Sequence, residues 1–250
     1  MQHLSDIKYL YGLIGFPLTH SFSKDYFAGK FKRENIHDSF YEVFPIPSIE
    51  LFPDLVERCK NLKGLNVTIP YKELIIPHLH DLDKISREIG AVNTIKFESG
   101  RMTGYNTDIW GFEKSLLPLL QPHHTHALIL GTGGGSKAIK YVLNKLGISY
   151  HVVSRSKGEN VITYEELKPG DIQEAKLIIN CSPAGMYPNV DVCPPVDYTA
   201  MGDKHLLYDL VYNPVETLFL KKGSEQGAAT KNGLEMLELQ AERSWQIWNE

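Results

Sequence analysis

Short apolar runs alternate with amphipathic segments along the first half of the chain. Runs rich in β-branched and aromatic residues predict strands, and apolar residues at helical spacing predict helices. The predicted strands cover residues 9–16, 40–44, 65–69 and 92–97, and the predicted helices cover 22–34, 48–59 and 83–89. This alternation indicates a mostly parallel sheet, in which ligands bind beyond the carboxyl ends of the strands. We therefore expect Ser21, Thr68 and Asn93 at a polar rim.

The same pattern starts again after a predicted helix at residues 107–117. An apolar strand at 127–130 runs directly into a glycine-rich loop, and a helix that ends at Leu146 follows. Further predicted strands cover 150–153, 177–179 and 206–208, and a last helix covers 234–248, whose apolar residues at helical spacing are expected in the core. The pattern predicts an α/β protein of two domains. The first domain comprises 1–106 and is completed by the C-terminal helix at 231–250, the second comprises 107–230, and a cleft lies between them.

Composition narrows the range of partners. The chain has 250 residues and a formal net charge of -4, which gives no broad attraction to nucleic acid or to an anionic membrane. No apolar run is long enough to span a bilayer, and the N-terminus has no secretory apolar core. The three cysteines are widely spaced, which favours a reducing cytoplasm over a disulfide framework or a zinc knuckle. His123, His124 and His126 favour a polar turn, so no metal site is expected.

A glycine-rich loop lies between a predicted strand and a predicted helix, and it consists of Gly131, Thr132, Gly133, Gly134 and Gly135. Glycines permit the tight turn and let backbone N–H groups approach a pyrophosphate, to which the helix N-terminus adds a favourable dipole. This context indicates a dinucleotide cofactor, with Ser136 in place of the third glycine of the commonest pattern. The alternative is a tight turn that holds no ligand.

An arginine stands where the ribose of a dinucleotide would be recognised. Arg155 follows Gly135 by about 20 residues, and it lies at the end of the next predicted strand between Ser154 and Ser156. An NAD enzyme carries an acid at this place, whereas a guanidinium flanked by hydroxyls suits a 2′-phosphate. The loop therefore favours NADP over NAD. An exposed loop arginine without a ligand is the alternative.

Two charged residues in the first half stand where strands and helices meet. Lys72 lies one short turn beyond the predicted strand 65–69, and Asp108 stands at the start of the predicted helix 107–117. Taken singly, Lys72 is typical of a solvated charge and Asp108 of a helix cap. Together they can form an acid/base pair, because hydride transfer at a carbon that bears a hydroxyl needs a partner for the hydroxyl proton.

The motifs of the chain, taken in order and spacing, resemble those of the shikimate dehydrogenases. Ser21 and Ser23, whose hydroxyls could bind a carboxylate or simply cap a helix, belong to the first of them. The motifs are GxPxxHSxS from Gly15 to Ser23, which includes His20, NVTIPYK from Asn66, GAVNT from Gly90, NTD from Asn106, the glycine loop, NCSPAGM from Asn180, YDLVYNP from Tyr208, and NGLEM from Asn232 with Gln240. Lys24 departs from the family pattern, which usually has proline after the second serine.

The resemblance implies an NADP-dependent oxidoreductase that reversibly reduces 3-dehydroshikimate to shikimate, on the way to chorismate and the aromatic amino acids. It assigns Lys72 and Asp108 as the catalytic pair. The substrate would be held by Ser21, Ser23, Thr68, Asn93, Tyr212 and Gln240. NADP would be held by the glycine loop with Ser154, Arg155 and Ser156, and its nicotinamide would lie along Leu210, Gly233 and Met236. The first domain is then the substrate-binding (catalytic) domain, and the second is a Rossmann-like NADP-binding domain.

Two other functions remain open in the sequence. One is a quinate/shikimate dehydrogenase of broader substrate and cofactor use. The other is a non-catalytic regulator of the same fold that binds shikimate-like ligands, although a sensor needs no acid/base pair such as Lys72 and Asp108. Tyr212 and Gln240, taken individually, could be ordinary packing or surface residues. A monomer and a homodimer are both compatible with the sequence.

Overall fold

The computed structural model describes residues 7–18 and 21–250 of the chain. The chain divides into two compact units, and each is built around one six-stranded sheet. Unit 1 comprises the residues up to Thr107 together with Gln240–Glu250, and unit 2 comprises Asp108–Leu239. The C-terminal helix α9 (Leu234–Asn249) therefore begins in unit 2 and ends in unit 1. The predicted α/β class is confirmed, and the functions assigned to the two domains stay predictions.

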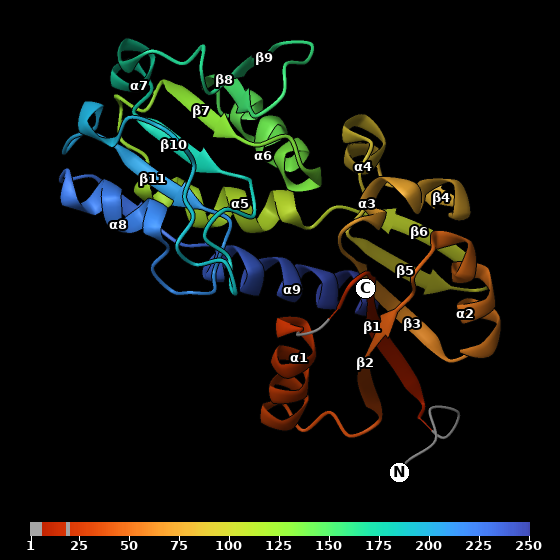
Figure 1. Ribbon diagram of the computed structural model, residues 1–250. Helices are drawn as coiled ribbons and strands as arrows, with labels where there is room; N and C mark the ends of the chain where they lie inside the picture. Colours follow the sequence, from red (N-terminus) through yellow and green to blue (C-terminus); the bar gives the residue numbers. More distant parts are fainter. Residues whose placement is uncertain (1–6, 19–20) are drawn as a thin grey trace. The chain divides into compact units, whose positions relative to one another are not determined.

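Unit 1 contains a sheet with the strand order β2-β1-β3-β5-β6-β4 (Figure 1). Its strands are β1 (Tyr9–Gly15), β2 (Ser39–Pro45), β3 (Leu62–Val67), β4 (Asp81–Leu82), β5 (Thr94–Glu98) and β6 (Arg101–Tyr105). Its helices, besides the end of α9, are α1 (Phe22–Arg33), α2 (Phe52–Arg58), α3 (Tyr71–Leu74) and α4 (Lys84–Ile89). The strand β6 was not predicted from the sequence.

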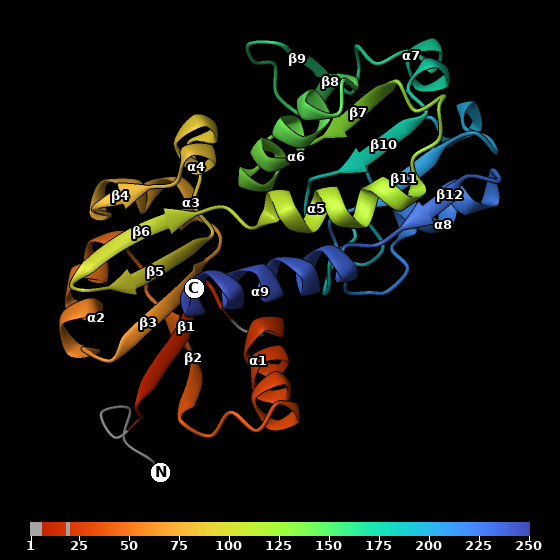
Figure 2. The ribbon, with the colours of Figure 1, turned by 180° about the vertical axis from the view of Figure 1, so that it is seen from behind.

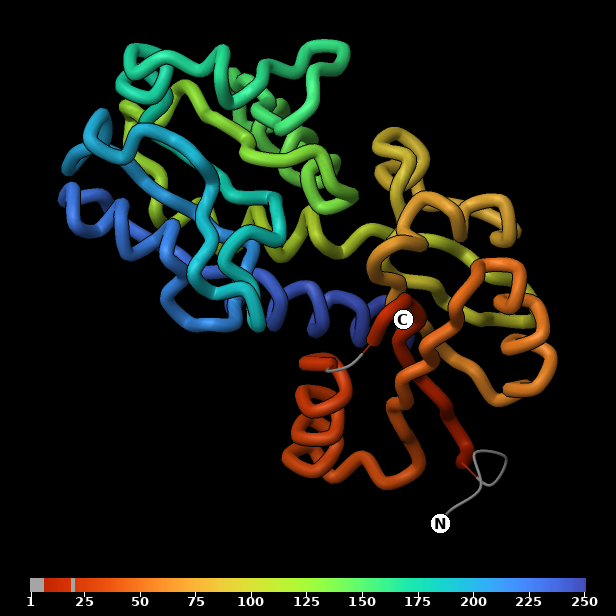
Figure 3. Tube along the Cα trace, viewed as in Figure 1, coloured from red at the N-terminus to blue at the C-terminus, as the bar shows by residue number. Residues whose placement is uncertain are grey.

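The sheet of unit 1 is mixed, which corrects the mostly parallel arrangement that the alternation of elements predicts. β1 pairs in parallel with β2 and β3, but β5 runs antiparallel to both β3 and β6. The reason is a tight hairpin, in which Ser99 and Gly100 adopt positive φ and connect β5 directly to β6 (Figure 3). Because β5 is reversed, its first residue, Thr94, pairs with Asn66 near the end of β3.

An aromatic cluster from α1, α9 and the first two strands fills part of the core of unit 1. Phe27 stacks on Tyr41 with ring centroids 4.5 Å apart, and Tyr11 lies 5.1 Å from the Trp248 ring. Trp248 is 4% exposed, and its indole N–H donates to Ile95 O over 3.0 Å. Of the core positions predicted from the helical spacing of the last helix, Ala241 and Trp248 are buried and Trp245 packs against this cluster, whereas Leu234 and Leu237 are half-buried.

Unit 2 contains an all-parallel sheet with the order β12-β11-β10-β7-β8-β9, which confirms the predicted Rossmann-like fold (Figure 2). Its strands are β7 (His126–Leu130), β8 (Ser149–Ser154), β9 (Val161–Thr163), β10 (Leu177–Asn180), β11 (Leu206–Asp209) and β12 (Ala229–Lys231). Its helices are α5 (Asp108–Leu116), α6 (Gly134–Lys145), α7 (Pro169–Glu174), α8 (Leu218–Glu225) and the start of α9. The edge strands β9 and β12 are too short to leave a pattern in the sequence.

Helices pack against the sheet of unit 2. α6 packs against β8, and α8 packs against β11 and β12. Leu128, Ile129, Ile178 and Ile179 are fully buried, as in strands that are covered on both faces. The parallel pairing brings the carboxyl ends of β7, β10 and β11 to one edge of the sheet, where the glycine loop begins.

We expect Gly64→Ala to lower the free energy of unfolding of unit 1 by about 1–3 kcal/mol. A Cβ on Gly64 would lie 2.3 Å from the Trp248 ring, which is held by its bond to Ile95, so the ring or the strand must shift. Gly170→Ala is the control, because a Cβ there meets nothing within 4 Å. Urea unfolding measures both variants, and equal stabilities would contradict the close packing of Trp248 on β3.

Candidate active site

The first predicted substrate residues lie at the start of α1. Ser21 is the N-cap of this helix, and its Oγ accepts a hydrogen bond from Lys24 N over 3.3 Å. Ser23 is 8% exposed and forms a hydrogen bond with the hydroxyl of Tyr41. Burial raises the pKa of the Tyr41 hydroxyl, and this hydrogen bond opposes the rise. His20 of the same motif lies outside the described residues. Ser21 therefore caps a helix, and the role of both serines toward a carboxylate stays a prediction.

Lys24 stands where the family pattern has proline. Its ammonium group bonds to Glu42 Oε1 on β2 at 2.5 Å, and both side chains are partly exposed. The extra positive charge beside Ser21 is thus matched by a carboxylate on a strand of the same unit. Lys24 also supplies the backbone N–H that Ser21 caps, which a proline would lack.

Backbone hydrogen bonds connect the segments around the end of β3 that carry three of the predicted site residues. Val67 N donates to Asn93 O over 2.8 Å, and Thr68 is the next residue along the chain. Val92 N donates to Lys72 O over 2.7 Å, which ties α3 to the segment that carries Asn93. Lys72 is half-buried. Thr68, Lys72 and Asn93 therefore lie on adjoining segments of unit 1.

Asn93 and Gln240 meet in a buried cluster of polar side chains, called the polar cluster below. Asn93 is 3% and Gln240 is 7% exposed, and Asn93 Nδ2 donates to Gln240 Oε1 over 3.4 Å. The other members of the polar cluster, which were not predicted as site residues, are Asn66, Thr94, Thr107 and Ser244. The first three stand inside the quoted motifs, and Ser244 follows Gln240 by one helical turn. Membership in these motifs could have identified Asn66, Thr94 and Thr107 from the sequence, and the helical spacing from Gln240 could have identified Ser244.

Two residues that were predicted to act on the substrate, Asp108 and Tyr212, belong to unit 2. Asp108 is the first residue of α5 and is 7% exposed, and it directly follows Thr107, whose N–H donates to Asn93 Oδ1. Tyr212 is half-buried, and burial raises the pKa of its hydroxyl. Since Lys72 lies in unit 1, its pairing with Asp108 stays a prediction, as does the role of Tyr212 toward the substrate.

The glycine loop has the backbone that a dinucleotide requires. Gly131 has a φ of 111°, and a Cβ there would lie 3.1 Å from Ser182 N, so glycine alone fits this position without strain. Gly133 is the N-cap of α6 and makes no side-chain capping bond. The first N–H groups of a helix lack intrahelical partners and bind phosphate groups well. The loop therefore fits the pyrophosphate of NADP.

The residues predicted along the nicotinamide gather at the end of β11. A Cβ on Gly135 would lie 3.2 Å from Leu210 Cδ2, and a Cβ on Gly233 would lie 2.2 Å from Leu210 O. Met236 is 7% exposed and lies in the first turn of α9. The structure thus brings Gly135, Leu210 and Gly233 into close contact, and their contact with NADP stays a prediction.

The loop after β8 carries the arginine predicted to select NADP. Arg155 and Ser156 are exposed, and Ser154 is half-buried at the end of β8. Burial raises the pKa of Tyr164 to about 12, and the nearby positive charge of Arg155 opposes this shift. An exposed guanidinium beside the carboxyl end of a strand is accessible to a phosphate, so the assignment of Arg155 stays a prediction.

A buried carboxylate connects the loops next to the glycine loop. Asp209 ends β11 and is fully buried. Its Oδ1 accepts from Asn180 Nδ2 at 2.9 Å and from Val211 N at 3.0 Å, and its Oδ2 accepts from Thr217 Oγ1 at 2.6 Å. Burial raises the pKa of Asp209 to about 6, and these three hydrogen bonds oppose the shift. Asp209 was not predicted as a site residue, although it stands in the YDLVYNP motif.

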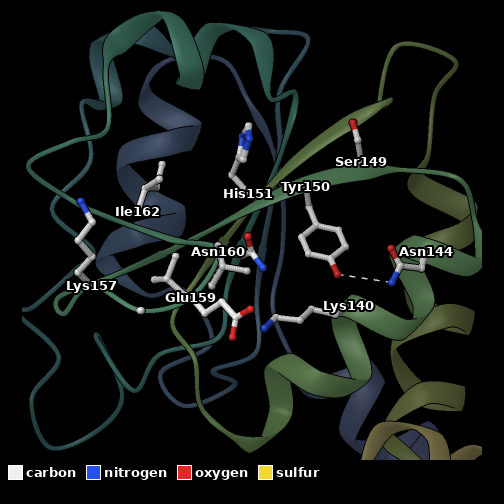
Figure 4. Close-up of a pocket in the computed structure, with 12 residues that line it drawn as sticks. Lys140, Asn144, Ser149, Tyr150, His151, Lys157, Glu159, Asn160 and Ile162 are labelled. Atoms are coloured by element: carbon white, nitrogen blue, oxygen red, sulfur yellow. Dashed lines mark hydrogen bonds between the residues drawn. The ribbon is translucent and has the colours of Figure 1, made fainter.

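A hollow of about 820 Å³ lies beside β8 (Figure 4). It is lined by residues of α6 and β8 and by the segment 157–162, and Asn144 Nδ2 donates to Tyr150 Oη there over 3.5 Å. Lys140, His151 and Glu159 are among its polar side chains. None of the residues assigned to substrate or NADP lines this hollow, so it is not part of the predicted site.

Of the histidines singled out in the sequence, His123 and His124 lie in the turn before β7, and His126 is the first residue of that strand. Gln121 N donates to His124 Nδ1 over 2.9 Å, and His124 N donates back to Gln121 O over 2.9 Å. Within residues 7–18 and 21–250, no group of three or more His, Cys, Asp or Glu side chains could hold a metal ion. In the same described part of the chain, no helix has the length and apolar character needed to cross a membrane.

The chain is similar to curated enzymes over nearly its whole length. A family model described as "Shikimate dehydrogenase substrate binding domain" matches residues 13–95, a stretch that contains Ser21, Lys72 and Asn93. The chain is 36% identical to the shikimate dehydrogenase (NADP(+)) of Methanosphaera stadtmanae, over an alignment that covers 95% of this chain and 90% of that protein. The chain belongs to the shikimate dehydrogenase family. The resemblance inferred from the motifs is thereby confirmed.

Solved structures of shikimate dehydrogenases share this fold. The enzyme from Aquifex aeolicus matches with a TM-score of 0.86 at 34% identity, over 97% of this chain and 92% of that chain. The shikimate 5-dehydrogenase from Thermus thermophilus, solved in complex with NADP(H) and shikimate, matches with a TM-score of 0.85 at 27% identity, over 96% and 93% of the two chains. This family member therefore shares its fold with an enzyme that was solved with both molecules bound.

We expect Asp209 to make this family member less stable as the pH rises from about 4 to about 7. Because its pKa is raised, the folded state binds a proton more tightly than the unfolded chain, so this stability is present at low pH and is lost as the pH rises through about 6. Asp209→Asn cannot titrate and serves as the reference. Relative to this variant, the wild type should lose about 2 kcal/mol between about pH 4.5 and about pH 7.5 in urea unfolding. A pH-independent difference would contradict the raised pKa.

Proposed function

We propose that this protein is an NADP-dependent shikimate dehydrogenase that reversibly reduces 3-dehydroshikimate to shikimate. The observation that carries the proposal is the buried amide pair of Asn93 and Gln240, next to the segments that hold Thr68 and Lys72. A cyclic acid with several hydroxyls needs neutral donors and acceptors in fixed positions. The names of the relatives, which are NADP-linked shikimate dehydrogenases, support the same substrate and cofactor.

Lys72 and Asp108 handle the proton in this proposal. During oxidation of the substrate, Lys72 Nζ takes the proton of the reacting hydroxyl, and during reduction it returns this proton. The carboxylate of Asp108, at the start of α5, orients the hydroxyl and stabilises the charged lysine. Lys72 is half-buried and Asp108 is nearly buried, so neither charge is fully screened by water.

The remaining substrate contacts are made by neutral groups. We assign the carboxylate to Ser21 and Ser23 and the ring hydroxyls to Thr68, Asn93, Tyr212 and Gln240. A buried donor or acceptor that a wrong substrate leaves unpaired costs about 1–3 kcal/mol. Several such contacts together distinguish one polyhydroxylated acid from another.

NADP is the cofactor of the proposed reaction, and its nicotinamide supplies or takes up the hydride when bound. The loop from Gly131 to Gly135 and the N-terminus of α6 would hold its pyrophosphate. Arg155, with Ser154 and Ser156, would bind the 2′-phosphate. Leu210, Gly233 and Met236 would lie along the nicotinamide. We further propose a cytoplasmic enzyme that acts as a monomer or a homodimer.

We expect the wild type to reduce NADP with shikimate at a far higher kcat/KM than with quinate, and Lys72→Ala to lower kcat by about 100- to 10,000-fold. The Kd for shikimate should stay within about threefold in Lys72→Ala, because the lysine acts on the proton and the neutral contacts remain. Spectrophotometric assays and calorimetric titrations measure these values. Lys60→Ala, an exposed lysine of the same unit, serves as the control and should retain full activity.

Each alternative function predicts a different result in these assays. Comparable turnover of shikimate and quinate would favour the broader quinate/shikimate dehydrogenase. Shikimate binding without turnover by the wild type would favour the non-catalytic regulator and reject the proposed activity. A normal kcat in Lys72→Ala would reject the role of this lysine while leaving the reaction itself in place.

We expect Arg155→Glu to raise KM for NADP by at least about tenfold and KM for NAD much less, because charge-assisted hydrogen bonds to a phosphate contribute about 1.5–3 kcal/mol. Lys221→Glu introduces the same change of charge at an exposed residue of unit 2 and should leave both constants unchanged. Steady-state kinetics with each cofactor provides the measurement. Equal increases in KM for NADP and for NAD would show that Arg155 does not bind the 2′-phosphate.

A further inference from the structure

Ser244 places a fully buried hydroxyl in the middle of the polar cluster. It lies on α9 one turn after Gln240, and its Oγ donates to Gln240 O over 2.9 Å. The same oxygen lies 3.0 Å from Asn66 Nδ2, 2.8 Å from Thr94 Oγ1 and 3.1 Å from Thr107 Oγ1. One hydroxyl thus connects α9 to β3, to β5 and to the residue before α5.

The direction of the hydrogen bonds in the polar cluster is set by a backbone N–H. Thr107 N can only donate, so the Asn93 atom that lies 2.7 Å away is the amide oxygen, Oδ1. The other end of that amide is therefore Nδ2, which donates to Gln240 Oε1 over 3.4 Å. Gln240 Oε1 also accepts from Thr107 Oγ1 over 3.3 Å. The oxygen end of the Gln240 amide thus faces the polar cluster, and its nitrogen end faces away.

The Ser244 hydroxyl restricts the polar cluster to this arrangement. Its proton is directed to Gln240 O, so its oxygen accepts from Asn66 Nδ2 and from the hydroxyl of Thr94. Without it, Asn66 Nδ2 retains only bonds of 3.3 and 3.4 Å, to Thr94 Oγ1 and Asn93 O. The hydroxyl of Thr107, which donates its one proton to Gln240 Oε1, also loses the polar neighbour that lies 3.1 Å away and holds it in place. Rearrangement of such a network lets the Gln240 amide rotate.

We propose that Ser244 is a positioning residue, which keeps the amide nitrogen of Gln240 directed toward the substrate. Gln240 then donates to a substrate oxygen that accepts a hydrogen bond, either a carbonyl or the lone pair of a hydroxyl. This inference rests on the proposed function, because it specifies how Gln240 binds the shikimate ring. Ser244 itself touches no substrate and acts through Gln240 and Asn93.

Kinetics and shikimate binding of Ser244→Ala test the proposal. We expect KM and Kd for shikimate to rise by about three- to tenfold, which corresponds to the loss of one net hydrogen bond. KM for NADP should stay within about twofold, because the glycine loop belongs to unit 2. Ser115→Ala is the matched control: Ser115 is 1% exposed, and its hydroxyl lies 2.7 Å from Gly111 O and 2.6 Å from Tyr208 Oη, outside the polar cluster. It should lose stability without a change in KM for shikimate.

A double-mutant cycle shows whether Ser244 acts through Gln240. In the Gln240→Ala background, Ser244→Ala should raise KM for shikimate by less than about twofold, because the amide to be positioned is gone. Ser244→Thr retains the hydroxyl and should restore KM toward that of the wild type. If Ser244→Ala does not fold, Ser244→Cys, whose thiol is a weak donor and acceptor, replaces it in the same cycle.

Three outcomes would overturn the proposal. The first is a KM for shikimate in Ser244→Ala that changes no more than in Ser115→Ala. The second is an undiminished effect of Ser244→Ala in the Gln240→Ala background, and both of these would leave the dehydrogenase activity of the wild type intact. The third is a wild type that turns over neither shikimate nor quinate, which would reject the proposed function together with the role of Ser244.

Discussion

The hydrogen bond from Thr107 N to Asn93 Oδ1 is the interaction on which the polar cluster of unit 1 depends. Because a backbone N–H can only donate, this contact of 2.7 Å decides the orientation of the Asn93 amide and, through it, that of Gln240. It also holds the chain at the residue directly before Asp108. A buried donor or acceptor without a partner costs about 1–3 kcal/mol, so the polar cluster has one strongly favoured arrangement. The same bond thus orders two proposed substrate residues, Asn93 and Gln240, and the start of the helix that carries the proposed catalytic carboxylate of Asp108.

The reversed strand β5 makes this arrangement possible. Its hairpin to β6 brings the amino end of β5 to the carboxyl end of β3, so that Asn93 and Thr94 lie next to Asn66. The helix α9 then packs its tryptophans into the aromatic core and directs Gln240 and Ser244 into the polar cluster. One helix therefore contributes both to the stability of unit 1 and to its candidate site.

In unit 2 the candidate site is formed by loops at one edge of a parallel sheet. The strands end at this edge, and the loops that follow them lack the regular backbone hydrogen bonds of a sheet, so other contacts must hold them in place. Gly131 accepts a positive φ that brings the glycine loop against Ser182, and the buried Asp209 carboxylate connects the loops after β10 and β11. The loops of the proposed NADP site are thus held by contacts and hydrogen bonds within unit 2.

The sequence by itself determined the α/β class, the strand, glycine loop and helix of unit 2, and the family, because apolar periodicity and glycine positions are local properties of the chain. It also placed Thr68, Lys72 and Asn93 in motifs that the fold brings onto adjoining segments. Only the tertiary structure decided the direction of β5, since a five-residue strand has the same pattern in either direction. It alone revealed Ser244 and Asp209, because a buried polar residue shows its role only through its partners. Asn66 and Ser244 are 178 residues apart in the sequence, and only folding joins them.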